Sequence, residues 1–394
     1  MAERYFAPCP RGLEAALADE LTQLGAVDVA ATDGGVAFAG DLMLATHANL
    51  ESRLASRILW RVGGGAYRNE KDIYALVHAI DWHRLFKPER TLRVDVAATR
   101  SPLTSLEFVT LRTKDAVCDR FRAECGIRPS VDKRAPDVRI YVYLTDRDAI
   151  VYVDTSGEPL FKRGYRRDAD EAPLRENLAA GLLALAHWTP AQTLLDPMCG
   201  SGTIVIEAAM IAAQRAPGLK RSFGFQKLTW YDGPSWQRIK QSAHDRVRAP
   251  SAMPTIFGSD VDAAAIAKAI SNISAAQVKG FATIERADVL TRSAPTSSGI
   301  VMANPPYGVR LSDQQQLAAF YPVLGDALKK RFAGWTAYLF SGDMRLPKLL
   351  GLKVAKRTPL HNGALDCRLF EIPLVAGSMR DGAMLKSSPN QLGS

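Results

Sequence analysis

Residues 194–203 read Leu-Leu-Asp-Pro-Met-Cys-Gly-Ser-Gly-Thr, and they are the strongest indication of the fold class. An apolar strand runs directly into a loop with two glycines, and the loop leads into a helix predicted over 204–214. Ligands of open α/β sheets bind beyond the carboxyl end of such a strand. The glycines allow close backbone approach to a ligand, and the helix N-terminus offers free N–H groups to a carboxylate.

This loop predicts a site for S-adenosylmethionine, whose methionine moiety carries a carboxylate. The predicted donor-binding residues of the loop are Asp196, Pro197, Met198, Cys199, Gly200, Ser201, Gly202 and Thr203. A pyrophosphate-binding loop is one alternative, but Val205 stands where its third glycine is expected, and Asp196 would lie close to the phosphates. A purely structural turn is the other.

Two acids follow later apolar strands and complete the predicted donor site. Asp260 is expected to accept hydrogen bonds from the ribose hydroxyls, and Asp288 from the adenine amino group. The neighbouring Asp262 could replace Asp260. An aspartate that caps the following helix is the structural alternative for each acid.

Helices alternate with short apolar strands through the second half of the chain. The expected strands are 193–195, 255–258, 282–284, 299–302 and 336–340. This alternation predicts a doubly wound, mainly parallel sheet with helices on both faces.

Asn304-Pro305-Pro306-Tyr307 follows one of these strands and is the predicted catalytic site. An aromatic exocyclic amine is a poor nucleophile because its lone pair is delocalised into the ring. If the Asn304 side-chain oxygen and the Pro305 carbonyl accept its two N–H bonds, the lone pair can face the methyl group of the donor. Tyr307 is expected to stack on the target base.

The first half predicts a small α+β module. Helices are expected at 13–21, 72–83 and 110–125, with a hairpin over 27–38 and strands at 91–98, 139–144 and 149–154. Gly63-Gly64-Gly65 is a candidate boundary, and the charged segment 161–173 is a candidate linker.

The net charge of +9 suits a polyanionic partner. Residues 1–170 carry 25 Lys and Arg against 25 Asp and Glu, whereas residues 171–394 carry 25 against 16, so the excess lies in the second half. The five cysteines show no metal-binding spacing, and no apolar run approaches a membrane span. Reduced thiols, no metal, no membrane and a cytoplasmic location are therefore expected.

Several further motifs carry a resemblance to a known family. They are residues 11–14 (Arg-Gly-Leu-Glu), 112–122, 126–132, 154–160, 162–166, 172–179 and 362–367. Together with the glycine loop and Asn304-Pro305-Pro306-Tyr307, they resemble THUMP-domain class I RNA (guanine-N2)-methyltransferases over about residues 4 to 375.

The resemblance implies an α/β fold with a Rossmann-like class I methyltransferase domain behind an α+β ferredoxin-like subdomain and a THUMP domain. The implied domains are 1–64 (ferredoxin-like), 65–160 (THUMP), 161–173 (linker), 174–378 (methyltransferase) and 379–394 (flexible tail). The implied reaction gives N2-methylguanosine in 23S ribosomal RNA, and no fused 7-methylguanosine module is expected. A tRNA guanine-N2 methyltransferase, a DNA amino-methyltransferase and a non-enzymatic RNA-binding assembly factor are the alternatives.

Three features depart from the family pattern: Phe161 replaces a frequent His, Val309 replaces a common Glu, and the THUMP-like half is not basic overall. RNA affinity must therefore come from a local patch. The candidate RNA-binding residues are Arg112, Lys114, Arg120, Arg122, Arg128, Lys133, Arg134, Lys162, Arg163, Arg166 and Arg167.

Overall fold

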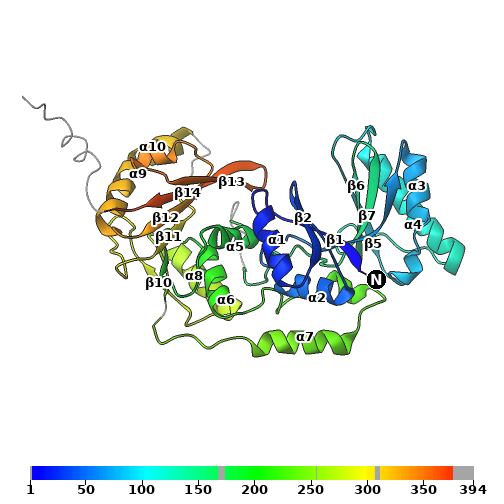
Figure 1. Ribbon diagram of the computed structural model, residues 1–394, viewed down its shortest axis with the longest axis horizontal. Coiled ribbons are helices and arrows are strands. Elements are labelled where there is room, and N and C mark those ends of the chain that lie inside the picture. The colour runs from blue at the N-terminus through cyan, green and yellow to red at the C-terminus, as the bar shows by residue number, and fades with distance from the viewer. Residues whose placement is uncertain (1, 167–173, 254, 307–310, 376–394) are drawn as a thin grey trace, which may run out of the picture. The chain divides into compact units, whose positions relative to one another are not determined.

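The structure is a computed structural model that describes residues 2–166, 174–253, 255–306 and 311–375, without the side chains at 311–316 and 318. The chain is divided into two compact units (Figure 1). The first contains Met1–Leu185, Met210–Pro250 and Ala275–Val278, and the second contains Ala186–Ala209, Ser251–Ser274 and Lys279–Ser394. The first unit therefore includes segments that were predicted to belong to the methyltransferase domain.

A seven-stranded sheet in the order β2-β3-β1-β4-β7-β6-β5 organises the first unit. Its strands are β1 (Glu3–Pro8), β2 (Val27–Thr32), β3 (Gly35–Gly40), β4 (Leu59–Ala66), β5 (Leu92–Ala98), β6 (Val138–Leu144) and β7 (Asp148–Asp154). Its helices are α1 (Glu14–Gln23), α2 (Leu42–Glu51), α3 (Glu70–His78), η1 (Trp82–Arg84), α4 (Leu106–Cys125), α5 (Glu176–Leu185), η2 (Gly224–Lys227) and α7 (Gly233–Asp245).

The triple glycine, predicted as a candidate boundary, lies inside strand β4. Gly63, Gly64 and Gly65 are paired with Val151, Ile150 and Ala149 of β7, while the beginning of β4 pairs with β1. A Cβ at Gly63 would lie 2.7 Å from Ile80 Cδ1, and one at Gly65 would lie 2.9 Å from Leu76 Cδ2. The glycines therefore allow close packing against the α3 segment.

Part of the predicted linker is also packed. Within the described residues 161–166, Arg163 and Tyr165 are buried. Residues 167–173 lie outside the described part of the chain.

The second unit contains the predicted doubly wound sheet, in the order β10-β9-β8-β11-β12-β14-β13. Its strands are β8 (Leu194–Asp196), β9 (Ile256–Asp260), β10 (Ala282–Arg286), β11 (Ile300–Ala303), β12 (Thr336–Ser341), β13 (Lys356–Asn362) and β14 (Leu365–Pro373). The helices that accompany it are α6 (Thr203–Ala212), α8 (Ala263–Ala276), α9 (Leu311–Arg331) and α10 (Leu346–Leu350).

Strands β8 to β12 are mutually parallel, and β14 joins β12 in antiparallel orientation. From β8 the chain proceeds outward through β9 to β10, then returns to β11 on the other side of β8. The order of strands therefore reverses between β8 and β11. In open α/β sheets this reversal is where ligands bind.

Candidate functional site

The donor loop follows β8 and is fixed by backbone contacts with β9. Cys199 N donates to Ser259 O at 2.9 Å, and Gly200 N donates to Asp260 Oδ2 at 2.9 Å. Gly200 and Gly202 have φ values of 51° and 85°, which favour glycine. A Cβ at Gly200 would meet nothing within 4 Å, whereas one at Gly202 would lie 3.1 Å from Ala269 Cβ. The loop therefore presents an open backbone cradle at the start of α6.

Three aspartates at or just after the ends of β9 and β10 have different environments. Asp260 accepts from Gly200 N and, through Oδ1, from Asp262 N at 3.0 Å. Asp262 Oδ1 accepts from Ala264 N at 2.9 Å, which makes Asp262 a cap of α8. Asp288 Oδ1 accepts from Leu290 N at 2.9 Å in the turn after β10. Each carboxylate oxygen of Asp260 retains a second lone pair for a ribose hydroxyl.

Asp196, at the end of β8, is a buried carboxyl group with one backbone donor. Met198 N donates to its Oδ1 at 3.2 Å, which favours the ionised form. Burial and then the neighbouring Asp260 carboxylate oppose this and raise the pKa of Asp196 to about 8. A cationic ligand beside Asp196 would favour its ionised form, and the amino group of S-adenosylmethionine is such a cation.

The Asn304 site follows β11, the strand next to β8. Asn304 Oδ1 is buried and has no hydrogen-bond partner within residues 255–306 or elsewhere in the described chain. Pro305 is buried and Pro306 is exposed. A buried acceptor without a partner costs about 1–3 kcal/mol, so it is a candidate for ligand contact. Tyr307 lies outside the described residues, as does Val309.

Tyr321 of α9 contacts the turn formed by Pro305 and Pro306, which we call the proline corner. Its hydroxyl donates a hydrogen bond to the Pro306 carbonyl, and its ring is fully buried. Burial raises the pKa of Tyr321 to about 12, so the hydroxyl stays protonated at neutral pH. Sequence reasoning missed this residue because no motif marks it: only the folded chain brings α9 to the corner.

The strand register brings the donor loop and Asn304 to one edge of the sheet. Leu195 of β8 pairs with Val301 of β11, so Asp196 is level with Met302 and Asn304 extends two residues further. Neighbouring strands lie about 4.8 Å apart, and two residues add about 6.6 Å along the strand. Both predicted sites therefore flank the reversal of strand order.

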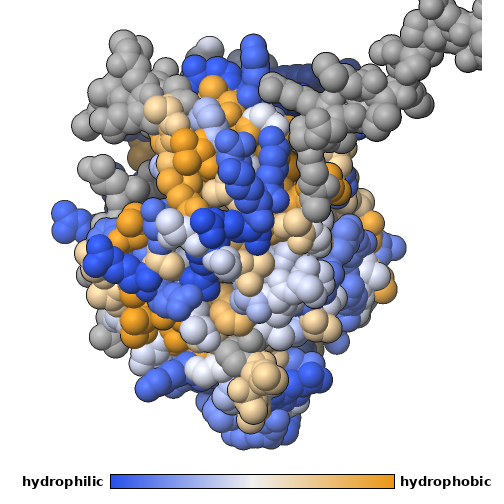
Figure 2. All heavy atoms as spheres, turned by 90° about the vertical axis from the view of Figure 1, so that its left-hand side faces the viewer, coloured by the Kyte–Doolittle hydropathy of each residue, from blue (hydrophilic) through white to orange (hydrophobic). Residues whose placement is uncertain are grey.

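Hydrophobic and hydrophilic residues lie next to one another on the side of the molecule that carries α9 and α10 (Figure 2). Met344 and Leu365 are among the exposed large apolar residues. A Cβ at Gly342, just after β12, would lie 3.1 Å from Leu365 Cδ2. The end of β12 thus meets the start of β14.

Most of the α4 cations among the RNA-binding candidates already have partners. Arg120 pairs with Asp81 at 2.6 Å and with Glu124 at 2.5 Å. Lys114 pairs with Asp115, which also lies 3.5 Å from Arg128, and Arg122 lies 3.7 Å from Asp119. Arg112 lies over the ring of Tyr74, 4.4 Å from its centroid. These ion pairs reduce the charge that α4 can offer to a phosphate.

Lys133 and Arg134 are exposed, and their side chains have no ion pair within residues 2–166. They remain the freest candidates of the predicted set. Lys162 is also exposed, but it pairs with Glu158 at 2.7 Å.

The structure corrects the prediction for Arg163 and weakens it for Arg166. Arg163 is only 3% exposed and donates to the carbonyls of Leu160 and Arg53 at 2.7 and 2.6 Å. Arg166 pairs with Glu176 at 3.4 Å, and both side chains are largely buried. Burial makes Arg163 a structural residue, since a phosphate could not reach it. Arg167 lies outside the described residues.

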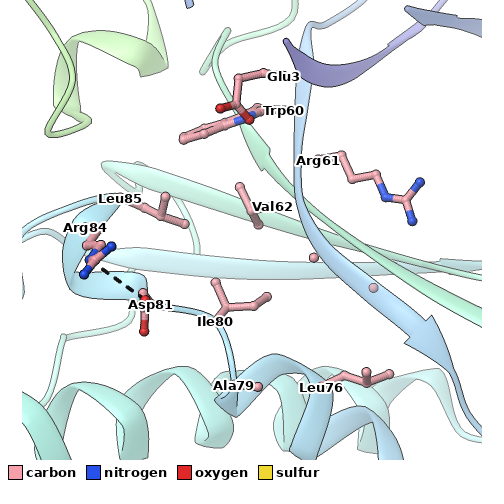
Figure 3. Close-up of a pocket in the computed structure, with 12 residues that line it drawn as sticks. Glu3, Trp60, Arg61, Val62, Leu76, Ala79, Ile80, Asp81, Arg84 and Leu85 are labelled. Carbon is pink, nitrogen blue, oxygen red and sulfur yellow. Dashed lines mark hydrogen bonds and ion pairs between the residues drawn. The ribbon is translucent and has the colours of Figure 1, made fainter. Parts of the chain in front are cut away.

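A cavity of about 490 Å³ lies in the first unit, and no residue of the donor loop lines it (Figure 3). Trp60 and Glu3 form one wall, and Ile80, Asp81 and Arg84 form the opposite one. One group of exposed ligand-type side chains, Asp81, His83 and Glu124, lies nearby, but Arg120 occupies two of its carboxylates. Cavity size alone therefore does not identify the catalytic site of this chain.

No helix in the described part of the chain is long and apolar enough to span a bilayer.

Family comparisons divide the chain into three matched regions. Residues 4–59 match the RlmL ferredoxin-like domain, residues 67–154 match the THUMP domain, and residues 163–371 match the RMKL-like methyltransferase domain. The order agrees with the sequence prediction. Residues 60–66, between the first two matches, contain the triple glycine.

Curated relatives are similar over almost the whole chain. The ribosomal RNA large subunit methyltransferase K/L of Methylococcus capsulatus is 41% identical over 379 residues, which cover 94% of this chain and 51% of that protein. The corresponding Aeromonas salmonicida protein is 39% identical over 398 residues, covering 96% and 55%. The chain thus spans about half the length of these relatives. Synechocystis slr0064, named as an RNA methyltransferase, is 38% identical over 94% of this chain and 96% of its own length.

Two solved structures share the architecture. SMU.472 complexed with SAH has a TM-score of 0.86 and 28% identity, covering 96% of this chain and 99% of that one. A predicted N6-adenine-specific DNA methylase from Listeria monocytogenes has a TM-score of 0.85 and 29% identity, covering 94% and 96%.

Proposed function

This chain belongs to the RMKL-like methyltransferase family, and we propose that it methylates the N2 amine of a guanosine in large-subunit ribosomal RNA. Its cofactor is S-adenosylmethionine. The observation that carries the choice of an amine is Asn304 Oδ1, a buried acceptor without a described partner at the edge where the donor loop lies. We place the reaction in the cytoplasm.

The donor site fits S-adenosylmethionine in three respects. The Gly200 cradle leaves backbone room, α6 begins at Thr203 and favours a carboxylate, and Asp260 can accept from ribose hydroxyls. Asp288 is the proposed acceptor for the adenine amine. When bound, the cofactor supplies a methyl group on a positively charged sulfur.

The protein contributes position rather than a strong base. Asn304 Oδ1 and the Pro305 carbonyl would accept the two N–H bonds of the target amine and direct its lone pair towards the donor. Pro306, held by Tyr321, makes this corner rigid. Tyr307 is the proposed stacking partner of the base.

Ribosomal RNA is favoured as substrate because the K/L relatives carry that substrate in their names. The matched THUMP domain supports RNA. Transfer RNA remains the nearest alternative, because the same site would serve it. Duplex DNA is the second candidate, since the Listeria structure is titled as a DNA methylase.

Labelled S-adenosylmethionine should distinguish these substrates. The protein is incubated separately with ribosomal RNA and transfer RNA from a deletion strain, and with duplex DNA, and the labelled nucleoside is mapped by mass spectrometry. Label as N2-methylguanosine in large-subunit RNA is expected. Label only in tRNA or DNA would replace the proposal, and a deletion phenotype rescued by Asn304→Ala would favour an assembly factor.

A further inference from the structure

The sheet of the first unit has two chemically different faces. Along β6, Val138, Ile140, Val142 and Leu144 point to the interior and are at most 1% exposed. The intervening Arg139, Tyr141 and Tyr143 are partly or fully exposed. Because side chains alternate along a strand, the polar set forms the opposite face. Figure 1 shows α3 and α4 on one side of β5, β6 and β7.

We name this opposite side the aromatic face. Its members from four neighbouring strands are Arg4, Phe6, Arg61, Arg139, Tyr141, Tyr143 and Tyr152. Register places Tyr141 directly opposite Tyr152, and Arg61 directly opposite Tyr152 on its other side. The ring centroids of Phe6 and Tyr152 lie 6.3 Å apart. The rings therefore form a row across β1, β7 and β6.

Tyr143 is the most accessible ring of this row. It is 37% exposed, and its hydroxyl donates to Thr99 Oγ1 at 3.0 Å. The contact anchors one edge of the ring and leaves its surface open to a partner. Tyr141 is more protected, because the guanidinium of Arg57 lies 5.6 Å from its ring centroid.

Two acids on this side of the sheet are already paired, Asp95 with Arg93 at 2.6 Å and Asp154 with Arg57, whereas two arginines there favour an anionic partner. Arg4 and Arg61 are exposed and have no ion pair within residues 2–166. Figure 3 shows Arg61 pointing away from the cavity beside Val62 and Ile80. Arg139 lies 3.5 Å from the exposed Glu158 and its side chain is only 13% exposed, so it contributes less than Arg4 and Arg61.

We infer that the aromatic face binds an unpaired segment of the RNA substrate, with a base stacked on Tyr143 and phosphates near Arg4 and Arg61. Aromatic side chains on a sheet suit splayed bases, whereas duplex RNA presents backbone and hides its base faces. This inference rests on the proposed function only in taking RNA as the partner.

Fluorescence anisotropy should test it with a labelled unstructured RNA oligonucleotide and the same sequence as a duplex. Tyr143→Ala should weaken single-strand binding about 10-fold. Tyr143→Phe keeps the ring and should restore most of the affinity. Arg61→Ala should weaken binding and lower the salt slope by about one.

Phe108→Ala provides a matched control, because Phe108 is a 48% exposed aromatic residue on α4, the other side of the sheet. It should bind both RNAs as the unmodified protein does. S-adenosylmethionine affinity, measured for every variant, reports whether the second unit remains folded.

Equal single-strand affinity for Tyr143→Ala and the unmodified protein would overturn the inference, as would an equal loss in Phe108→Ala. Methyl incorporation by the unmodified protein reports separately on the proposed function. Binding that depends on Tyr143 without RNA methylation would leave this inference standing and reject that function.

Discussion

The carboxyl edge of the second sheet and the aromatic face of the first differ in what they would offer a ligand. At the edge, the proposed contacts are the Gly200 backbone and the buried Asn304 Oδ1. On the face, the proposed contacts are the exposed side chains of Tyr143 and Arg61 on regular strands. A buried, preorganised site should lose function steeply when one atom is removed. An exposed surface should lose affinity gradually.

Asn304→Ala tests the prediction for the buried site and should have the largest effect. Methyl transfer should slow by about 100- to 1,000-fold, because the oriented acceptor is lost. S-adenosylmethionine affinity should be unchanged. Single-turnover kinetics with labelled donor and calorimetric titration measure the two quantities. Asn304→Asp keeps an acceptor oxygen and should retain more activity, and a near-normal rate in the alanine variant would exclude the proposed role.

Asp260→Ala should separate binding from catalysis at the same edge. Loss of two hydrogen bonds to the ribose should weaken S-adenosylmethionine binding by about 10- to 100-fold. Asp262→Ala is the matched control. It removes the α8 cap, at about 1 kcal/mol of stability, and should leave donor affinity unchanged. The reverse pattern would assign the ribose to Asp262.

Asp196 should make the ligand-free protein less stable as pH rises. Its folded pKa, about 8, exceeds the ordinary value of 3.8, so the folded state holds a proton that the unfolded state has released between these values. The contribution of Asp196 to the free energy of unfolding is fully present below pH 3.8 and is lost progressively as the pH rises to about 8. Thermal unfolding of Asp196→Asn against the unmodified protein should show the smaller pH slope in the variant.

The raised pKa of Asp196 also predicts that the affinity of the protein for S-adenosylmethionine increases up to about pH 8, because the cationic ligand favours ionised Asp196. A pH-independent affinity across this range would contradict that coupling.

Tyr321→Phe should have the smallest effect. One hydrogen bond to Pro306 is lost while the buried ring remains, so kcat should fall about 2- to 10-fold with an unchanged KM for the donor. Steady-state kinetics would show whether kcat falls while the KM for the donor stays unchanged. A change confined to thermal stability would make Tyr321 a packing residue only.

The local geometry at the ends of β8 and β11 was largely predictable because its information is local. Gly202 needs a positive φ and Pro306 stiffens a corner, and each leaves a mark in the sequence beside an apolar strand. Alternating apolar segments likewise predicted the five parallel strands. Tyr321 could not be found this way, because its value comes from a tertiary contact with Pro306.

The front half shows what the sequence leaves ambiguous. Gly63-Gly64-Gly65 is typical of a turn, yet here it lets Ile80 and Leu76 approach a strand. Arg163 carries the same charge as Arg134, but one is buried and the other exposed. Residue type gives the charge of a side chain, and only packing decides whether a ligand can reach it. The binding role inferred for the aromatic face was not predicted, although apolar residues alternate with Arg139, Tyr141 and Tyr143 in the sequence of β6.

Strand β4 joins two regions that the family comparisons treat as separate. It pairs with β1 of the ferredoxin-like match and with β7 of the THUMP match. A cut between the two matches would therefore expose unpaired backbone on both fragments. The two regions should therefore fold and move as one rigid body. A base bound on β6 would then stay at a constant distance from β1.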